Sequence, residues 1–430
     1  MTALLQIAAR SAWNRRGTLA LVVLSIALAT ALLLGLERLR NDIRGSFTQS
    51  VSGTDLIVGA RTGPVQLMLY AVFRVGGATN NISMDSVRAV AAHRAVAWTV
   101  PIALGDSHRG HPVLGTTPDY FTHFAYGDRQ PLGLAQGRAF SGTLDGLYEA
   151  VLGAEVAQQL GYLLGQRITL THGMSAGGGE GGGLATEHAD KPFTVVGVLA
   201  RTGTPVDRTV HVSLQAIEAI HLDWAGGAPL PGVSIAPEQA RKFSLEPKQV
   251  TAVLVGLKNR VAVFNVQRFV ADYEGEPLLA VLPGVALDEL WAAVGLGERA
   301  LLAMSGLVAL VSLASLVAVV LAGLNERRRE LAVLRAVGAG PRHVLALLAT
   351  EGALVTLSGA VLGATAAAVA VLAAGPWVQQ RFGITLQATA PTVEQWALFA
   401  AVLLAGMLAS LVPGWRAYHL SLADGLTPRT

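Results

Sequence analysis

Four long apolar segments limit how this 430-residue chain can fold more than any other feature. They cover residues 17–36, 300–324, 344–374 and 395–413. A helix that crosses a bilayer needs about 20 predominantly apolar residues, so each segment is predicted to be a transmembrane helix. Residues 37–299 hold no comparable run, and they are predicted to form a globular domain between the first and second helices.

Composition agrees with this mixed architecture. The chain is 52% hydrophobic and only 14% charged, which is more apolar than an ordinary soluble protein and more polar than a chain of spans alone. Cysteine is absent, and this decides little about the compartment.

Basic residues indicate the orientation, because Lys and Arg accumulate in short cytoplasmic loops. Arg15 and Arg16 precede the first apolar segment, Arg327 to Arg329 join the second to the third, and Arg416 follows the fourth. All three places are therefore predicted to be cytoplasmic, and residues 37–299 to be extracytoplasmic. The pI near 9.3 is explained by this topology and not by a nucleic-acid surface.

The first 16 residues alternate apolar and polar side chains, and we expect an amphipathic helix on the cytoplasmic membrane surface. A frayed terminus is the alternative. A cleaved signal peptide is a third interpretation, since Ala27-Leu28-Ala29 has the small residues of a cleavage site. The apolar run continues beyond that site to Leu36, which favours a full span.

Short β-rich runs alternate with helical runs in residues 37–299, as in an α/β or α+β domain. Within this domain, an inserted subdomain is expected at about 135–210. Outside it, residues 325–343 connect the second and third spans, residues 375–394 form a short outer loop, and residues 414–430 form a cytoplasmic tail. The predicted strands are 55–58, 96–104, 111–115, 167–171, 193–199, 210–213 and 250–257, and the predicted helices are 84–92, 154–161, 214–221, 261–273 and 287–298, the last running into the second span.

The charged segment 325–343 has the pattern of a short amphipathic helix. Glu326 and Glu330 are one turn apart, while Leu331 and Leu334 begin an apolar stripe that ends at Gly338. Gly340-Pro341 then ends the helix. The alternative is a basic loop that only satisfies the topology rule, but such a loop needs neither a glutamate pair nor an apolar stripe.

Residues 325–339 resemble the cytoplasmic signature of the MacB/FtsX-like ABC transporter permease family. Further resemblance to the MacB-type domain lies in residues 115–121, 151–157, 164–170 and 193–199, and to the family's closing segment in 413–417. It implies a membrane α-helical fold with four transmembrane helices and a large α/β (α+β) extracytoplasmic domain of MacB type between helices 1 and 2. The implied ATPase-coupling residues are Asn325, Glu326, Arg327, Arg328, Arg329, Glu330, Leu331, Leu334, Arg335 and Gly338.

The resemblance implies a stand-alone permease in the bacterial inner membrane, with its large domain in the periplasm. No Gly-Lys pair occurs, so a phosphate-binding P-loop is absent from this sequence, and we expect ATP and Mg²⁺ to bind a separate ABC ATPase subunit. Two permease copies, identical or paralogous, would transmit ATP-driven motion to the periplasm, where a periplasmic partner could join them. The expected substrate is a lipid, lipoprotein or peptide, and no enzymatic motif is present.

Two alternatives stay open. Eight of the ten histidines lie in residues 37–299, and His172, His188 and Asp190 flank a Gly-rich stretch that we expect to be a flexible excursion. These residue types bind zinc, which points to metal-related transport or sensing. The second alternative is an FtsX-like regulator of a periplasmic cell-wall hydrolase, although such regulators normally have a smaller domain.

The third span carries a close-packing pattern. Gly359 and Gly363 form Gly-x-x-x-Gly, and Gly352 precedes them on the same helix, so another helix can approach closely here, either within the chain or in a second copy. Glu351 is an intramembrane carboxylate, and it is predicted to face protein or water rather than lipid.

Overall fold

The computed structural model describes residues 16–50, 52–76, 79–173, 187–225, 228–230, 234–326, 337–382, 386 and 390–419. The chain divides into two compact units. The membrane unit comprises Met1–Ile43, Val294–Arg381 and Thr385–Thr430, and the sheet domain comprises Arg44–Ala293 with Phe382–Ile384.

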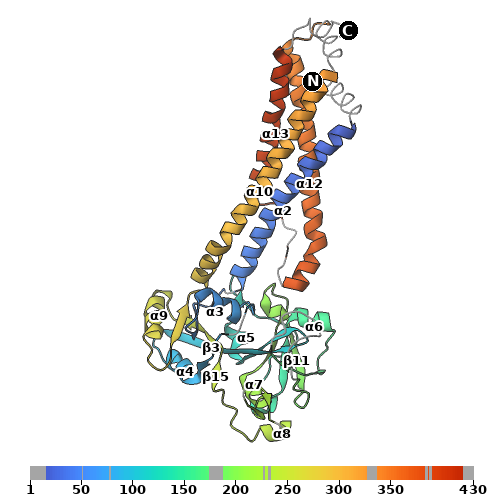
Figure 1. The fold of residues 1–430 in the computed structure, drawn as a ribbon. Coiled ribbons are helices and arrows are strands. Elements are labelled where there is room, and N and C mark those ends of the chain that lie inside the picture. Colours follow the sequence, from blue (N-terminus) through green and yellow to red (C-terminus); the bar gives the residue numbers. More distant parts are fainter. Residues whose placement is uncertain are drawn as a thin grey trace. The chain divides into compact units, whose positions relative to one another are not determined.

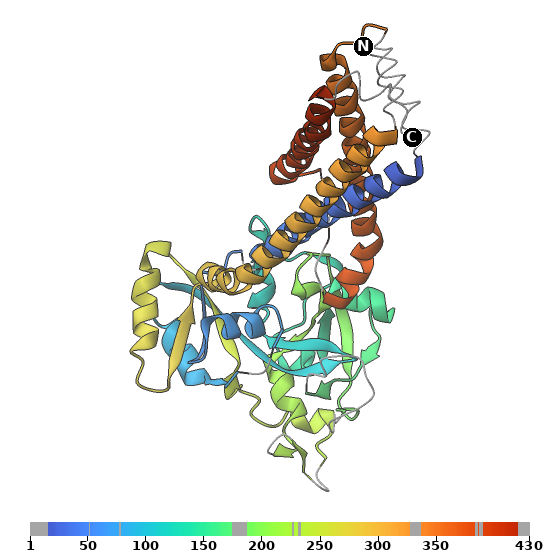
Figure 2. The ribbon, with the colours of Figure 1, turned by 45° about the horizontal axis from the view of Figure 1, so that its top comes forward.

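Four long helices carry the apolar segments: α2 (Arg16–Gln49), α10 (Pro283–Glu326), α12 (Pro341–Phe382) and α13 (Val393–His419) (Figure 1). Each contains a stretch that is long and apolar enough to cross a membrane. The prediction of four transmembrane helices is thereby confirmed. Figure 2 shows α2 and α10 side by side from a second direction. The two helices are joined by a hydrogen bond between Ser25 Oγ and Ser312 Oγ, which lie 2.9 Å apart.

All four helices extend beyond the apolar segments from which they were predicted. Helix α2 continues from residue 36 to Gln49, and Arg38 pairs one turn along with Asp42 at 3.4 Å. Such i,i+4 pairs support a helix after its apolar stretch has ended. Helix α12 continues past Pro376 to Phe382, so part of the region 375–394 is helical rather than loop.

An 11-stranded mixed sheet forms the centre of the sheet domain, with the order β17-β1-β16-β3-β4-β12-β8-β11-β7 along its main path. The pairs β12–β4 and β11–β8 are parallel, and the other pairs along this path are antiparallel. These strands are β1 (Leu56–Ala60), β3 (Val96–His108), β4 (His111–Thr116), β7 (Leu134–Gly137), β8 (Glu149–Leu152), β11 (Phe193–Leu199), β12 (Val210–Ser213), β16 (Ala252–Leu257) and β17 (Leu278–Val281).

Shorter elements complete the domain. Strand β10 (Thr171–His172) pairs with β3, and β9 (Arg167–Ile168) pairs with β11. The two-stranded pieces are β2 (Ile82–Ser83) with β15 (Gln249–Val250), β5 (Ala125–Tyr126) with β6 (Gln130–Pro131), and β13 (Trp224–Ala225) with β14 (Ala228–Pro229). The helices are α3 (Pro64–Ala71), α4 (Met84–Ala91), α5 (Asp119–His123), α6 (Ala154–Leu160), α7 (Leu214–Ile220), α8 (Pro237–Ala240) and α9 (Val263–Ala271).

Most elements predicted from the sequence of this domain are present. The strands predicted at 193–199 and 210–213 coincide with β11 and β12. The strand predicted at 250–257 is divided at Thr251, since β15 pairs with β2 in a separate two-stranded sheet and β16 pairs with β3 in the main sheet. The helix predicted from residue 287 begins earlier, at Pro283, and continues without a break through the second span.

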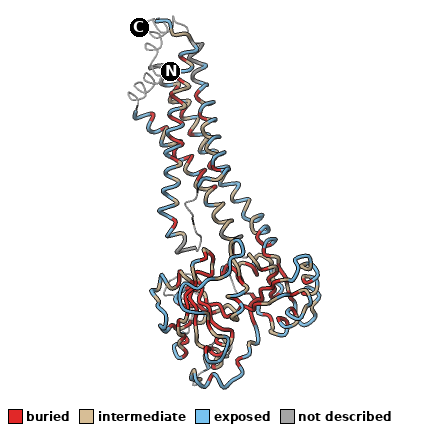
Figure 3. The backbone as a smooth tube through the Cα atoms, turned by 180° about the vertical axis from the view of Figure 1, so that it is seen from behind, coloured by how far each residue is buried: buried red, intermediate tan, exposed pale blue. Residues whose placement is uncertain are grey.

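Burial explains why the strands predicted from apolar runs form here. All five residues of β1 are buried, and so are the first five of β16, as expected for central strands covered on both faces. In Figure 3 the buried residues concentrate in the strands of the sheet domain, whereas the long helices carry more exposed and intermediate positions. Exposed leucines and valines on those helices fit surfaces that face lipid.

Candidate functional site

The segment predicted to couple to an ATPase lies mostly outside the described residues. Arg327, Arg328, Arg329, Glu330, Leu331, Leu334 and Arg335 are among the residues whose placement is not described. Asn325 and Glu326 close α10, and Pro341 begins α12. Gly338 has a φ of +101°, a conformation that favours glycine.

The glycines of the third span are packed against other helices of the same chain. A Cβ on Gly363 would lie 2.4 Å from the Ala27 carbonyl oxygen, and one on Gly359 would lie 2.8 Å from Ile26 Cβ, so both glycines contact α2. A Cβ on Gly352 would lie 2.3 Å from Ser410 Cβ on α13. These three glycines therefore hold α12 between α2 and α13 within one chain.

Glu351 is 4% exposed in α12. Its neighbour along the chain, Gly352, packs against α13. The carboxylate therefore lies inside the helix bundle rather than on its lipid-facing surface, which is the placement expected for an acidic side chain in a span.

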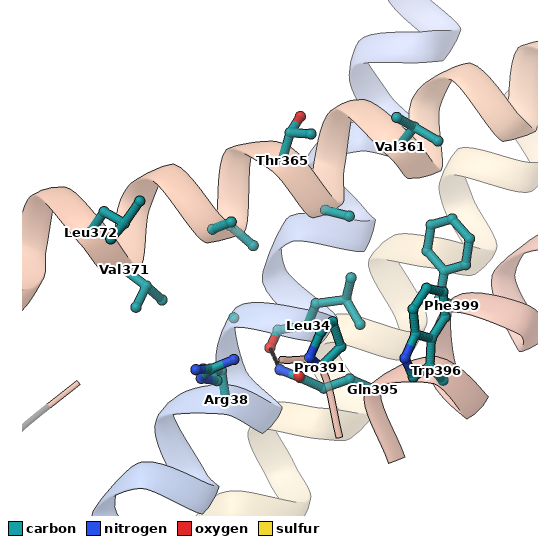
Figure 4. Close-up of a pocket in the computed structure, with 14 residues that line it drawn as sticks. Leu34, Arg38, Val361, Thr365, Val371, Leu372, Pro391, Gln395, Trp396 and Phe399 are labelled. Atoms are coloured by element: carbon teal, nitrogen blue, oxygen red, sulfur yellow. Dashed lines mark hydrogen bonds between the residues drawn. The ribbon is translucent and has the colours of Figure 1, made fainter. Parts of the chain in front are cut away.

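An apolar pocket of about 390 Å³ lies among α2, α12 and α13 (Figure 4). Leu34, Val361, Leu372 and Phe399 contribute to its walls, and Arg38 lies at its edge. Gln395 Nε2 donates to the Leu34 carbonyl oxygen at 3.4 Å. Because the pocket is formed by helices that cross the membrane, a lipid acyl chain is a suitable occupant.

Within the sheet domain, four side chains from separate elements converge. Strands β3 and β10 are paired in a register that sets His172 directly opposite Asp106. His221 caps the C-terminus of α7, and His188 follows Glu187, which forms an isolated β-bridge with Thr171. We call Asp106, His172, His188 and His221 the His/Asp cluster.

The potential ligand atoms of the His/Asp cluster all lie within 4.8 Å of one another. His172 Nδ1 lies 3.0 Å from Asp106 Oδ1 and 3.0 Å from His221 Nε2. His221 Nε2 lies 3.6 Å from Asp106 Oδ1. Asp106 and His188 are buried, and the other two side chains are partly exposed.

The electrostatics differ between members of the cluster. The hydrogen bond to Asp106 raises the pKa of His172, and burial opposes that effect. Burial, followed by the neighbouring His221, lowers the pKa of His188 to about 4. His188 is therefore a neutral imidazole at pH 7, the form in which histidine acts as a metal ligand.

Asp190, which the sequence suggested as a ligand together with His172 and His188, is not part of the cluster. Its carboxylate pairs with Lys191 Nζ at 2.6 Å. Asp106 and His221 take part instead, and they lie 66 and 49 residues from His172 along the chain. The accumulation of histidines in this domain was the only sequence signal for His221, and nothing in the sequence singled out Asp106.

The helices and the domain define a class of protein: a multi-pass membrane protein with a mixed-sheet domain inserted between its first and second spanning helices. Two family models match it, the MacB-like periplasmic core domain over residues 18–268 and the FtsX-like permease C-terminal over residues 302–422. The chain belongs to this MacB/FtsX-type family of ABC transporter permeases, as the resemblance in its sequence implied. The family is a permease component, typically non-catalytic, of ABC transporters.

Two solved structures match part of the chain. The periplasmic region of MacB from Actinobacillus actinomycetemcomitans matches with 11% identity and a TM-score of 0.34, over 59% of this chain and 97% of that one. The extracellular domain of YknZ, a noncanonic ABC-type transporter from Gram-positive bacteria, matches with 14% identity and a TM-score of 0.31, over 53% and 98%. A search of curated proteins finds no match. The family assignment rests on the two family models.

Proposed function

We propose that this chain is a permease subunit that couples ATP hydrolysis by a separate ATPase to a conformational change in its extracytoplasmic domain. The family match is the observation that carries this proposal, because the FtsX-like match over residues 302–422 includes the whole charged segment 325–343. That segment has the charged face and the apolar stripe that a docking helix needs.

The long helices support transmission of movement. Helix α10 runs as one helix from Pro283 to Glu326, so the residues before the second span and the span itself belong to one element. The charged segment follows directly at its end. A displacement of that segment by an ATPase would therefore act on the end of a continuous helix.

We place the chain in the bacterial inner membrane with the sheet domain in the periplasm, and we expect a second permease copy, identical or paralogous, beside it. The substrate would be a lipid, lipoprotein or peptide handled outside that membrane. The apolar pocket of α2, α12 and α13 favours a substrate with an acyl chain, although bulk lipid fits the same pocket. A periplasmic partner would receive or deliver the substrate.

The test is a double charge reversal in the charged segment, Glu330→Lys with Arg335→Glu. We expect the wild-type chain, co-expressed with its ABC ATPase, to bind the ATPase and to change its ATP turnover. Losing a desolvated interfacial charge pair costs roughly 2–5 kcal/mol, so binding should weaken by about thirtyfold or more. ATPase co-purification and turnover measure both effects, and the permease alone should not hydrolyse ATP.

A matched control reverses a charge pair far from this segment. Arg88 Nη1 and Glu246 Oε1 form an exposed pair at 2.7 Å in the sheet domain. The variant Arg88→Glu with Glu246→Lys changes as many charges but should bind the ATPase normally. If the Glu330/Arg335 variant is as stable as wild type and still activates the ATPase normally, the segment is only a topology signal and the proposal fails.

A further inference from the structure

The His/Asp cluster combines the ligand types that zinc prefers. Three imidazole nitrogens and one carboxylate oxygen form a four-ligand set of the kind found in zinc sites, whereas calcium takes six to eight oxygen ligands and magnesium six. The four ligand atoms therefore suit Zn²⁺ or a similar ion and do not suit Ca²⁺ or Mg²⁺.

Distances in the cluster fit one small ion. Around a tetrahedral zinc ion with bonds near 2.0–2.2 Å, neighbouring ligand atoms are about 3.3–3.6 Å apart. The three distances among His172 Nδ1, His221 Nε2 and Asp106 Oδ1 are 3.0, 3.0 and 3.6 Å. Movements of a few tenths of an ångström would therefore bring these three atoms to coordination distance.

Two further ring nitrogens bear on metal binding. One sets the tautomer of His221, and the other belongs to His188 and is buried. His221 Nδ1 lies 2.8 Å from the Ile217 carbonyl oxygen, which can only accept, so Nδ1 carries the proton and the lone pair of Nε2 faces the cluster. His188 is 1% exposed, and its buried Nε2 has no hydrogen-bond partner among the residues that the structure describes. A buried, unpartnered imidazole nitrogen is costly, and a metal ion in the cluster would satisfy it.

Neighbouring groups hold the cluster together. The Lys191 backbone N–H donates to the His188 carbonyl oxygen at 3.2 Å, and Lys191 Nζ pairs with Asp223 at 2.9 Å, two residues after His221. The Trp224 ring packs on His188 with a centroid distance of 4.5 Å. These contacts fix the segment that carries His188 beside the end of α7.

An ion has a path to the cluster from solvent. A pocket of about 400 Å³ is lined by Asp106, His172 and His221, and Glu218 and Lys248 also contribute to its walls. Three of the four candidate ligands therefore border open space, and His188 closes the site from within the protein. This is the arrangement expected of a binding site that exchanges its ion.

We propose that Asp106, His172, His188 and His221 bind one zinc-class divalent ion in the sheet domain. The inference goes beyond the proposed coupling function and does not depend on it. Coordination by His172 Nδ1 requires the loss of the proton that Nδ1 donates toward Asp106 and His221 Nε2. A neutral His172 takes up a proton at Nε2 as Nδ1 gives its own to solvent, so it changes tautomer with no net release, whereas an imidazolium keeps its Nε2 proton and releases one proton to solvent. The domain is then stabilised by the ion, because the unfolded chain does not bring these four residues together.

The experiment uses the full-length chain, purified in detergent with a histidine-free tag and stripped with a chelator. Zn²⁺ is titrated in competition with a chromophoric chelator, and Co²⁺ is added separately to record the visible absorption of a tetrahedral site. We expect one Zn²⁺ per chain with a Kd tighter than about 1 µM. Mg²⁺ and Ca²⁺ should not compete.

Three variants test the assignment of ligands. His172→Gln with His221→Gln should weaken Zn²⁺ binding by at least about 100-fold, since even outer-shell changes cost 10–100-fold. Asp106→Asn keeps the side-chain shape and should weaken binding at least about tenfold. Asp190→Asn is the matched control, because Asp190 pairs with Lys191 outside the cluster, and its Zn²⁺ affinity should equal that of wild type.

Unfolding in the presence of chelator shows whether each variant folds. If the His172/His221 double variant is unfolded, the near-isosteric Asp106→Asn variant tests the proposal alone. Its Zn²⁺ affinity is then compared with that of the Asp190→Asn control. The proposal is overturned if folded wild type binds less than half an equivalent of Zn²⁺, or if a folded Asp106→Asn or His172/His221 variant binds as tightly as wild type. In either case the cluster is a hydrogen-bonded network without a metal.

Discussion

The sheet domain and the membrane unit pack through different kinds of contact. The sheet domain encloses whole ionisable side chains, among them Lys191 at 1% exposure, paired with Asp223, and His211 at 0%. In the membrane unit, close contacts come from backbone approach at glycine, as between Gly363 and Ala27, and from the Ser25–Ser312 hydroxyl pair. Apolar burial drives the folding of the domain, whereas helices in lipid gain most from close packing.

The largest change in the free energy of unfolding is expected in the sheet domain, at Lys191. Lys191→Met removes the partner of the buried Asp223 carboxylate, and breaking a buried pair in this way costs about 3–5 kcal/mol. Denaturant unfolding of the chain with chelator present should show that loss. Asp190→Asn is the control, because that carboxylate is partly exposed and its pair with Lys191 contributes about 1 kcal/mol or less. Equal stability of both variants would contradict the buried-pair interpretation.

A smaller effect is expected from pH, through His211. Burial, with the Arg74 guanidinium second, lowers the pKa of His211 to about 3. Below an unfolded pKa of about 6.5, the unfolded chain binds a proton that the folded chain does not, so stability falls as pH falls.

Between pH 6.5 and 4.5 this single group should cost about 2–3 kcal/mol, at about 1.36 kcal/mol per pH unit. His211→Gln should make the pH dependence of the unfolding free energy shallower by that amount, while stability at pH 8, where the imidazole is neutral in both states, gives the baseline. An unchanged slope would mean that His211 is not held neutral by burial.

The smallest of the three effects is expected in the membrane unit. Gly363→Ala places a methyl group 2.4 Å from the Ala27 carbonyl oxygen, and overpacking of this kind costs about 1–3 kcal/mol. Gly306→Ala on α10 is the matched control, since nothing lies within 4 Å of its added Cβ. Unfolding in mixed detergent should separate the two variants. If Gly363→Ala is as stable as Gly306→Ala, α2 and α12 do not pack through this glycine.

Local sequence patterns predicted the elements well. The apolar segments at 17–36 and 300–324 lie within α2 and α10, and the runs at 193–199 and 210–213 form β11 and β12. Segment ends were less predictable. Helix α2 continues to Gln49 with an i,i+4 ion pair between Arg38 and Asp42. A predicted strand is divided at Thr251 into two pieces, which pair with β2 and with β3 in different sheets.

For the His/Asp cluster, the sequence provided the residue types and the structure selected among them. His172 and His188 were candidates because both flank a Gly-rich stretch, but the same reasoning suggested Asp190, which pairs with Lys191. The register of β10 on β3 sets Asp106 opposite His172, and the end of α7 adds His221. Pairing between distant strands is decided by the packing of the whole sheet, which no local pattern contains.

The sequence by itself determined the four spanning helices, the separate domain between the first two, and the family, because hydrophobic length and short motifs are local properties of the chain. Only the tertiary structure decided that Gly359 and Gly363 contact α2 of the same chain and that four residues from β3, β10, α7 and the segment after Glu187 converge. Such contacts join residues far apart in sequence, and they form only when helices and strands pack to fill space, so their partners are fixed by the fold as a whole.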